Sequence, residues 1–310
     1  MCGGGGCGVA RELGRLLTAM ITPFAEDGTV DEAGCGALAR ALLASGSDGL
    51  VLTGTTGECP SLSSEEQVGV WRIVRTAVGP DATLIAGAST NSTAESLELV
   101  RQGDGAGMDA LMLTVPYYNK PSQAGLARHF EVLTEATRLP CILYNVPSRT
   151  ALNMTAETTV RLAELPNVVG VKEASGDLAQ IAEIIERTSG GHETFSVWSG
   201  NDGDTLPLLA IGGYGVVSVA SHLVGLQIAE MIDASLAGHA EAASVIHRRL
   251  APLVAALFIE SNPTPVKFAL NELGFRVGSV RLPLVPPTES SSARIRAELA
   301  RHSIDLPIAD

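Results

Sequence analysis

The sequence predicts an α/β protein, a (β/α)8 TIM barrel with a C-terminal helical appendage. Three observations favour this fold. From Leu16 onward, eight short apolar runs alternate with longer stretches of helical pattern. The runs show little alternation of polar and apolar residues, as expected for parallel strands that are covered on both faces. Together the eight units span roughly 220 residues, close to the ~250 residues typical of this barrel.

Eight apolar runs are the expected strands, taken in chain order. The first four are Leu17–Phe24, Gly49–Gly54, Thr83–Ser89 and Ala110–Pro116. The last four are Cys141–Val146, Val168–Glu173, Thr194–Ser199 and Gly215–Ala220. Helices are expected between them, for example over Ser64–Val78 and Asp177–Thr188. In the first of these helices, Ser64 is the expected N-cap, and Gln67 would complete a capping box.

The alternative architecture is an open, doubly wound sheet. That fold has a phosphate-binding glycine turn after its first strand, and Thr22-Pro23-Phe24 offers no such turn. We therefore expect one barrel domain at residues 14–224, preceded by a flexible glycine-rich tail at residues 1–13. Residues 225–310 are expected to form C-terminal helices packed on the barrel.

Composition excludes several classes of protein and partner. The chain has 45% hydrophobic residues, which is enough apolar surface to fold rather than remain disordered. It has no apolar run of ~20 residues, so no membrane partner is expected. Its net charge of −13 argues against nucleic acid as a partner, because nucleic acid binds clustered lysine and arginine.

Cysteine and histidine usage indicates the compartment and the absence of a metal. The five cysteines are odd in number and form no Cys-x-x-Cys pair. No secretory signal pattern opens the chain, so we expect a reduced, cytoplasmic location. The six histidines show no metal-ligand spacing, and no metal is expected.

Lysine is scarce in this chain, with only Lys120, Lys172 and Lys267 beside 18 arginines. Lysine, unlike arginine, can be desolvated, lose its proton and attack a carbonyl. Lys172 ends the expected sixth strand, where burial would lower its pKa and prepare it for a Schiff base with a keto acid. The alternative is a buried lysine paired with a carboxylate, but the adjacent Glu173 would point to the opposite face of the strand. Lys120 is expected to be solvated, while Lys267 either supports the fold or acts electrostatically on the substrate side.

Other polar side chains also occur where strands are expected to end, and active sites of this fold lie at those ends. Tyr144 lies one strand from Lys172 and could shuttle protons, although a single tyrosine is more often a core residue. Thr55 and Thr56, between two glycines, can hold a carboxylate through hydroxyls and backbone amides, although such turns are common loops. Arg149 either binds a second carboxylate through two hydrogen bonds or forms a surface ion pair.

Six motifs give the chain, from about Leu16 to its C-terminus, a specific resemblance to one family. They are GTTGE at 54–58, PYYNKPSQ at 116–123, LYNVPSRT at 143–150, GVKEASG at 170–176, GYGVVSV at 213–219 and NPTPVK at 262–267. With these motifs the chain resembles the 4-hydroxy-tetrahydrodipicolinate synthase (dihydrodipicolinate synthase) family. This family lies within the pyruvate-dependent class I aldolase superfamily of N-acetylneuraminate lyase.

The resemblance implies a lyase of the class I aldolase type that needs no cofactor. Lys172 would form the Schiff base with pyruvate. Tyr144 would shuttle protons, assisted by Thr56 and by Tyr118 from a neighbouring subunit. The resemblance also implies a homotetramer built as a dimer of tight dimers, with Tyr118 crossing the tight interface.

The same motifs imply the substrate-binding residues. Thr55, Thr56 and the backbone of Val217 would line the pyruvate pocket, with Gly200 shaping the wall opposite. Arg149 would anchor the carboxylate of L-aspartate 4-semialdehyde. The enamine carbon would attack this aldehyde. The product, 4-hydroxy-tetrahydrodipicolinate of diaminopimelate and lysine biosynthesis, would cyclise onto its own amine and release the enzyme lysine.

Two alternatives stay open. A paralogous pyruvate-dependent aldolase or lyase would act on another aldehyde or a 2-keto-3-deoxy acid, but Arg149 in its Pro-Ser-Arg context favours the small amino-aldehyde acid over a sugar. A catalytically silent relative would bind pyruvate-like ligands as a sensor. The intact set of catalytic side chains disfavours this second alternative.

Lysine-inhibited members of the family have an allosteric pocket at the tight-dimer interface. Three residues of this chain match it: Asn91, Glu95 and Tyr117. Ser64 and Gln67 stand where inhibited enzymes often have histidines, and Pro60 occupies a lining position. We therefore expect weak or absent feedback inhibition by lysine.

Overall fold

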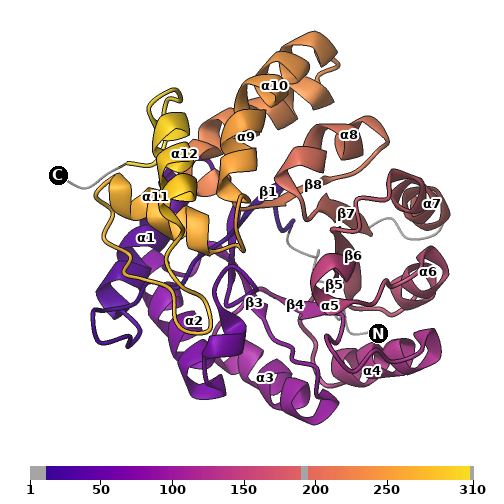
Figure 1. Cartoon of the computed structure of the whole chain (residues 1–310). Helices are drawn as coiled ribbons and strands as arrows, with labels where there is room; N and C mark the ends of the chain where they lie inside the picture. The colour runs from indigo at the N-terminus through magenta and orange to yellow at the C-terminus, as the bar shows by residue number, and fades with distance from the viewer. Residues whose placement is uncertain (1–11, 190–194, 308–310) are drawn as a thin grey trace, which may run out of the picture.

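The computed structural model describes residues 12–189 and 195–307, and in them it shows a closed barrel of parallel strands (Figure 1). Each strand pairs with the next along the chain, and β8 pairs with β1 to close the barrel. The strands are β1 (Leu16–Ala19), β2 (Gly49–Leu52), β3 (Thr83–Gly87), β4 (Ala110–Thr114), β5 (Cys141–Asn145), β6 (Val168–Glu173), β7 (Ser196–Ser199) and β8 (Gly215–Ser218). The predicted TIM barrel is confirmed.

An outer ring of helices covers the barrel. The helices between successive strands are α1 (Glu32–Ala44), α2 (Ser64–Val78), α3 (Thr93–Gly105), α4 (Gln123–Glu135), α6 (Ala156–Ala163), α7 (Leu178–Ser189) and α8 (Thr205–Ala210). Short segments lie in the loops after strands: η1 (Cys59–Ser61), α5 (Pro147–Thr150) and η2 (Asp202–Asp204). After β8 come the expected C-terminal helices α9 (Ser221–Leu236), α10 (Ala240–Leu257), α11 (Thr264–Glu272) and α12 (Glu289–Leu299). In the described part of the chain, no helix has the length and apolarity needed to cross a membrane.

At both expected limits of the barrel domain, the chain is packed against the barrel. Residues 1–11 of the expected tail lie outside the described residues, while Leu13 is buried in the barrel interior. The limit expected at residues 224/225 falls inside α9, at Val224, whose backbone angles are not helical. Helix α9 packs between α8 and α1 (Figure 1) and so completes the outer ring of helices. The expected limit would have divided this helix between the barrel and the C-terminal unit.

Most strands end earlier than the apolar runs that predict them. The first run extends to Phe24, but β1 ends at Ala19, and Met20 and Phe24 are buried outside the strand. Apolar residues that follow a strand pack under the loops at the mouth of the barrel, so the run continues after strand pairing has stopped. The expected and observed bounds coincide at β6, Val168–Glu173.

Helix α2 begins at Ser64, as expected, but its cap lies one residue earlier than predicted. The N-cap is Ser63. Its side chain accepts a hydrogen bond from the backbone N–H of Glu66, and the Glu66 side chain accepts one from the backbone N–H of Ser63. The prediction of Ser64 and Gln67 as the capping box is wrong. Both serines are followed three residues later by a residue that can complete a capping box, so the sequence pattern fits either register. Gln67 is instead buried and directs its amide at the backbone oxygen of Leu62.

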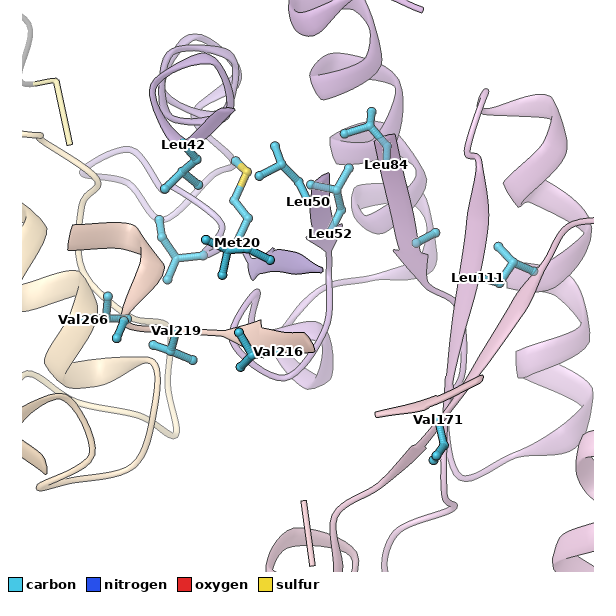
Figure 2. Close-up of a cluster of buried hydrophobic side chains, with 14 of the residues drawn as sticks. Met20, Leu42, Leu50, Leu52, Leu84, Leu111, Val171, Val216, Val219 and Val266 are labelled. Atoms are coloured by element: carbon cyan, nitrogen blue, oxygen red, sulfur yellow. The ribbon is translucent and has the colours of Figure 1, made fainter. Parts of the chain in front are cut away.

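Side chains alternate along each strand between two cores. On β2, Leu50 points into the core between barrel and helices, and Val51 points into the barrel interior. Figure 2 shows part of the outer core, with Leu50 and Val171 among its members. On β6, the same alternation turns Val171 outward and Lys172 inward. Lys172 therefore meets Tyr144, a member of the interior cluster, inside the barrel.

Candidate active site

Lys172 lies at the C-terminal end of β6, and it is 5% exposed. Burial is the main cause that lowers its pKa to about 7. Arg149 acts in the same direction as burial, and Asp202 acts in the opposite direction. An ordinary lysine has a pKa of about 10.4, so a large share of Lys172 is the free amine at neutral pH. The free amine is the form that attacks a carbonyl.

The neighbouring Glu173 has partners of its own on the other face of β6. Asn145 Nδ2 donates to its two carboxylate oxygens at 3.1 and 3.0 Å, and the backbone N–H of Ser175 donates to it at 2.8 Å. The expectation that Glu173 is a poor partner for Lys172 is confirmed.

Tyr144 lies directly across from Lys172, because the parallel register of β5 and β6 pairs the two residues. The Lys172 Nζ atom is 4.2 Å from the centroid of the Tyr144 ring. Burial raises the pKa of Tyr144 to about 12, against the opposing effects of Arg149 and of a hydrogen bond with Thr55. The phenol is therefore protonated at neutral pH and can donate or relay a proton close to the lysine amine.

The turn after β2 places two threonines in the site, and they have different partners. The side chain of Thr55 hydrogen-bonds to Tyr144. Thr56 is buried, and its hydroxyl accepts from Asn262 Nδ2 at 2.8 Å. The expected assistance of Tyr144 by Thr56 stays a prediction. Successive residues of the turn face different neighbours, and Thr55 is the residue against the phenol.

A buried ion pair anchors this turn. Glu58, the last residue of the GTTGE motif, pairs with Lys267 Nζ at 2.6 Å, and both side chains are at most 2% exposed. The same Nζ atom lies 3.9 Å from the centroid of the Phe24 ring. The backbone N–H of Arg281 donates to the second carboxylate oxygen of Glu58 at 2.9 Å. Of the two roles left open for Lys267, these contacts favour support of the fold.

Arg149 lies on α5 at the mouth of the barrel, where its side chain is exposed. Its Nη2 atom donates to the backbone oxygen of Asn262 at 3.2 Å. Its charge lowers the pKa of both Lys172 and Tyr144, so it acts electrostatically on the same site. A guanidinium group has five N–H donors, which lets this side chain bind a carboxylate while it keeps its bond to Asn262.

Gly200, directly after β7, forms the wall beside the lysine. A Cβ atom at this position would lie 2.6 Å from Ala174 Cβ and 3.2 Å from Lys172 Cε. Glycine therefore fits where a larger residue would displace its neighbours. Val217, on β8, is buried, and its side chain packs in the barrel interior.

Tyr118 is separate from the other expected site residues. It lies in the loop after β4 and is 88% exposed, with a φ of 75° that is uncommon for residues other than glycine. A single chain therefore does not bury Tyr118 against Lys172 and Tyr144.

Two polar residues that contact the expected site residues or act on them electrostatically were not expected from the sequence. Asp202, in η2, accepts hydrogen bonds from the Ser218 hydroxyl and from the Val219 backbone N–H, and its charge raises the pKa of Lys172. Asn262 bonds to both Thr56 and Arg149. The signals for them were present, because Asp202 follows Gly200 closely and Asn262 opens the NPTPVK motif.

The fold and these contacts define a class of enzyme. A buried, partly deprotonated amine that faces a protonated phenol at the end of a barrel strand is arranged for Schiff-base chemistry on a carbonyl substrate. This is a lyase of the class I aldolase type. The model of the Dihydrodipicolinate synthetase family matches residues 12–302, and the chain belongs to this family.

Known relatives are similar over nearly the whole chain. A 4-hydroxy-tetrahydrodipicolinate synthase from Dehalococcoides mccartyi is 55% identical over 298 residues, which cover 96% of this chain and 99% of that protein. The crystal structure of dihydrodipicolinate synthase from Bacillus anthracis has a TM-score of 0.90 and 44% identity, covering 93% of this chain and 98% of that one. The enzyme from Cyanidioschyzon merolae with lysine bound has a TM-score of 0.91 and 44% identity, covering 93% of this chain and 97% of that one.

Proposed function

We propose that this chain is a 4-hydroxy-tetrahydrodipicolinate synthase, which condenses pyruvate with L-aspartate 4-semialdehyde in diaminopimelate and lysine biosynthesis. The observation that carries the proposal is the buried Lys172 amine, with a pKa of about 7, placed 4.2 Å from the Tyr144 ring. Membership in the family and the 55% identity to a relative of that name support the choice of substrates.

The reaction begins with the free amine of Lys172, which attacks the carbonyl carbon of pyruvate. The carbonyl oxygen takes up a proton, and loss of water from the resulting carbinolamine gives the Schiff base. Tyr144 delivers and receives these protons, and Thr55 is the next member of the relay because it hydrogen-bonds to the phenol. Loss of a proton from the pyruvate methyl group then gives the enamine. The protonated imine withdraws electrons itself, so this step uses no cofactor.

The second half of the reaction joins the two substrates. The enamine carbon bonds to the aldehyde carbon, whose oxygen takes up a proton. The amino group of the added substrate then attacks the imine carbon, closes the ring and releases Lys172. Arg149 binds the carboxylate of the aldehyde, and the Thr55–Thr56 turn binds that of pyruvate. Gly200 and the Val217 backbone complete the pyruvate pocket.

The active assembly is a homotetramer of two tight dimers, in which Tyr118 reaches the site of the neighbouring subunit. Two observations support this arrangement. Tyr118 is 88% exposed, and its backbone has a strained φ of 75°. Both features suit a side chain that a second subunit buries, since a large exposed aromatic ring gains most from an interface.

The enzyme works in the cytoplasm, on small-molecule substrates. Its described cysteines Cys35, Cys59 and Cys141 are free thiols. Burial raises the pKa of each to about 12, so they remain protonated and unreactive. A reducing compartment suits this cysteine usage.

Feedback inhibition by lysine is weak or absent in this chain. Gln67, at one of the two positions where inhibited relatives often have histidine, is buried, and its amide points at the backbone oxygen of Leu62. Its amide is therefore engaged with the backbone of its own chain. A lysine titration of the initial rate tests this proposal, and strong inhibition at low lysine concentration would contradict it.

A turnover assay tests the proposed function. The protein is supplied with pyruvate and L-aspartate 4-semialdehyde, and formation of the cyclic product is followed. Parallel reactions contain other aldehydes or 2-keto-3-deoxy acids. We expect the amino-aldehyde to be the preferred substrate. Faster turnover of a 2-keto-3-deoxy acid would favour the paralogous aldolase instead.

A further inference from the structure

Asn262 is a buried polar residue of the site with one unpaired atom. It immediately precedes the N-cap of α11 and is 6% exposed. Its Oδ1 atom is buried and has no hydrogen-bond partner among residues 12–189 and 195–307. A buried acceptor without a partner is unfavourable, and such groups in a folded protein require an explanation.

The paired atoms of Asn262 place it between the two carboxylate subsites. Its Nδ2 atom donates to the Thr56 hydroxyl at 2.8 Å, in the turn assigned to pyruvate. Its backbone oxygen accepts from Arg149 Nη2 at 3.2 Å, and Arg149 is assigned to the second substrate. The bond to Thr56 fixes the plane of the carboxamide group, so Oδ1 is held as a preformed acceptor beside the pyruvate turn.

The second substrate has a donor at the matching place. In L-aspartate 4-semialdehyde, the carbon with the amino group lies between the carboxylate, which Arg149 binds, and the CH2–CHO end, which reaches the enamine on Lys172. We propose that Asn262 Oδ1 accepts a hydrogen bond from this amino group. Asn262 thereby selects an amino-aldehyde acid over the same acid without the amine. This inference rests on the proposed function and adds to it the residue that recognises the amino group of the second substrate.

The two charged side chains assigned to the substrates, Arg149 and Lys172, do not make this distinction. Arg149 binds the carboxylate, which both acids possess, and Lys172 engages pyruvate. A site that hydrogen-bonds a substrate N–H rejects an analogue without it much more strongly than an apolar pocket rejects a missing methylene, because the buried acceptor is then left unpaired. Asn262 is therefore a specificity residue for the second substrate.

The experiment compares two aldehydes that differ only in the amine. The protein is loaded with one equivalent of pyruvate and mixed with L-aspartate 4-semialdehyde or with succinic semialdehyde. Samples quenched with borohydride at intervals trap the adducts on Lys172, and intact mass distinguishes the pyruvate adduct from the aldol adduct. The measured quantity is the rate constant with which each aldehyde consumes the pyruvate adduct. The ratio of the two constants is the selectivity.

The native chain is expected to favour the amino-aldehyde, and Asn262→Ala is expected to lower the selectivity by about tenfold or more, chiefly by slowing the amino-aldehyde. Asn262→Asp keeps an acceptor in place and lets the Thr56 hydroxyl donate to it. Its selectivity is expected to stay within about threefold of the native value, because a carboxylate is a strong acceptor for an ammonium group. The exposed Asn271, which bonds to the Gly278 backbone oxygen at 2.9 Å, is the matched control. Asn271→Ala is expected to leave the selectivity unchanged.

Two results would overturn the inference. If Asn262→Ala slowed both aldehydes equally, Asn262 would act only through Thr56. If Asn262→Asp lost the selectivity as fully as Asn262→Ala, the group that meets the substrate would not be an acceptor. The pyruvate adduct formed by each variant shows that its site is folded. A native chain that forms this adduct and consumes neither aldehyde would remove the proposed function, and this inference with it.

Discussion

A lysine amine attacks a carbonyl only after it has lost its proton, and burial provides this condition at Lys172. The barrel interior lowers the pKa of the lysine to about 7 and raises that of Tyr144 to about 12. The same environment therefore favours the neutral form of both groups, since a low dielectric disfavours either charge. A free base and a protonated acid then lie side by side at neutral pH, as the chemistry of a Schiff base requires.

The lowered pKa of Lys172 predicts the pH dependence of pyruvate adduct formation. The free amine is the reactive form, so the initial rate of borohydride trapping should rise through pH ~7 and level off above it, whereas an ordinary lysine would continue to gain reactivity to about pH 10. The measurement is the trapping rate between about pH 5.5 and about pH 9 at saturating pyruvate. A rate that still climbs tenfold per pH unit at the alkaline end would contradict the pKa of about 7.

Gly200 predicts a steric effect on the same lysine. A Cβ atom here would lie 3.2 Å from Lys172 Cε and 2.6 Å from Ala174 Cβ. Gly200→Ala should therefore slow pyruvate trapping by about tenfold or more, because a small misplacement of a reacting group has a large effect on its rate. Gly203→Ala is the matched control, since a Cβ atom there meets nothing within 4 Å. Equal trapping rates in the two variants would show that Gly200 does not shape the site.

The sequence was sufficient to predict the residues whose place depends on local pattern. Lys172 and Tyr144 follow from strand alternation and from the parallel register of neighbouring strands. The partner of Thr56 could not be predicted, because Asn262 is 206 residues away and reaches it only through the packing of the C-terminal helices. The contact between Thr55 and the phenol could not be predicted for a different reason, because turn geometry decides which of two adjacent hydroxyls meets the phenol.

Among the elements, the turn after β2 depends most on distant support. Thr53 and Glu58 both have positive φ values, 47° and 58°, so the turn is strained at both ends. The Trp71 indole N–H donates to the Thr53 hydroxyl at 2.7 Å, and Lys267 pairs with Glu58. These contacts hold the two threonines in position.

The Glu58–Lys267 pair predicts a large loss of stability when one partner is removed. Lys267→Met leaves a carboxylate buried without its counter-charge, which should lower the free energy of unfolding by about 3–5 kcal/mol. The double variant Glu58→Gln with Lys267→Met should recover much of this loss. Urea denaturation measures both values.

An exposed ion pair gives the comparison. Arg187 and Glu183 pair at 2.7 Å on the surface of α7, and Arg187→Ala should lower stability by less than about 1 kcal/mol. If the double variant were as unstable as Lys267→Met alone, the loss would come from packing around Phe24 and not from the unpaired charge.

Element boundaries show where sequence patterns stop being informative. Helix α2 begins at Ser64 as predicted, but two overlapping capping-box patterns differ by one residue, and hydrogen bonding selects the one at Ser63. The first strand ends at Ala19 although apolar residues continue to Phe24. Apolar patterning reports burial, and burial extends beyond strand pairing at the mouth of the barrel.

At the scale of the whole molecule, one chain holds all but one of the proposed catalytic side chains. Lys172 and Tyr144 meet inside the barrel, whereas Tyr118 is 88% exposed on the same chain. If Tyr118 completes the site of a neighbour, as proposed, catalysis requires the tight dimer. Assembly and activity are then coupled through this one side chain.

Subunit mixing tests that coupling. Lys172→Ala and Tyr118→Phe should each be nearly inactive in turnover. When the two variants are mixed and reassembled, each hybrid dimer would have one intact site. That site takes the native Lys172 from one subunit and the native Tyr118 from the other. An equal, random mixture should regain up to about a quarter of the native activity, because half of the dimers are hybrids with one intact site each. No recovery on mixing would show that Tyr118 serves its own chain or no site at all.

The central claim is that Lys172 forms a covalent Schiff base with pyruvate, and mass spectrometry after borohydride reduction tests it most directly. The native chain, mixed with pyruvate and reduced, should gain the mass of one reduced pyruvate adduct, and peptide mapping should place it on Lys172. Lys172→Ala should gain no mass, while Lys267→Met should still be labelled at Lys172 in its folded fraction. An unlabelled native chain, or label on Lys120 or Lys267 instead, would contradict the account.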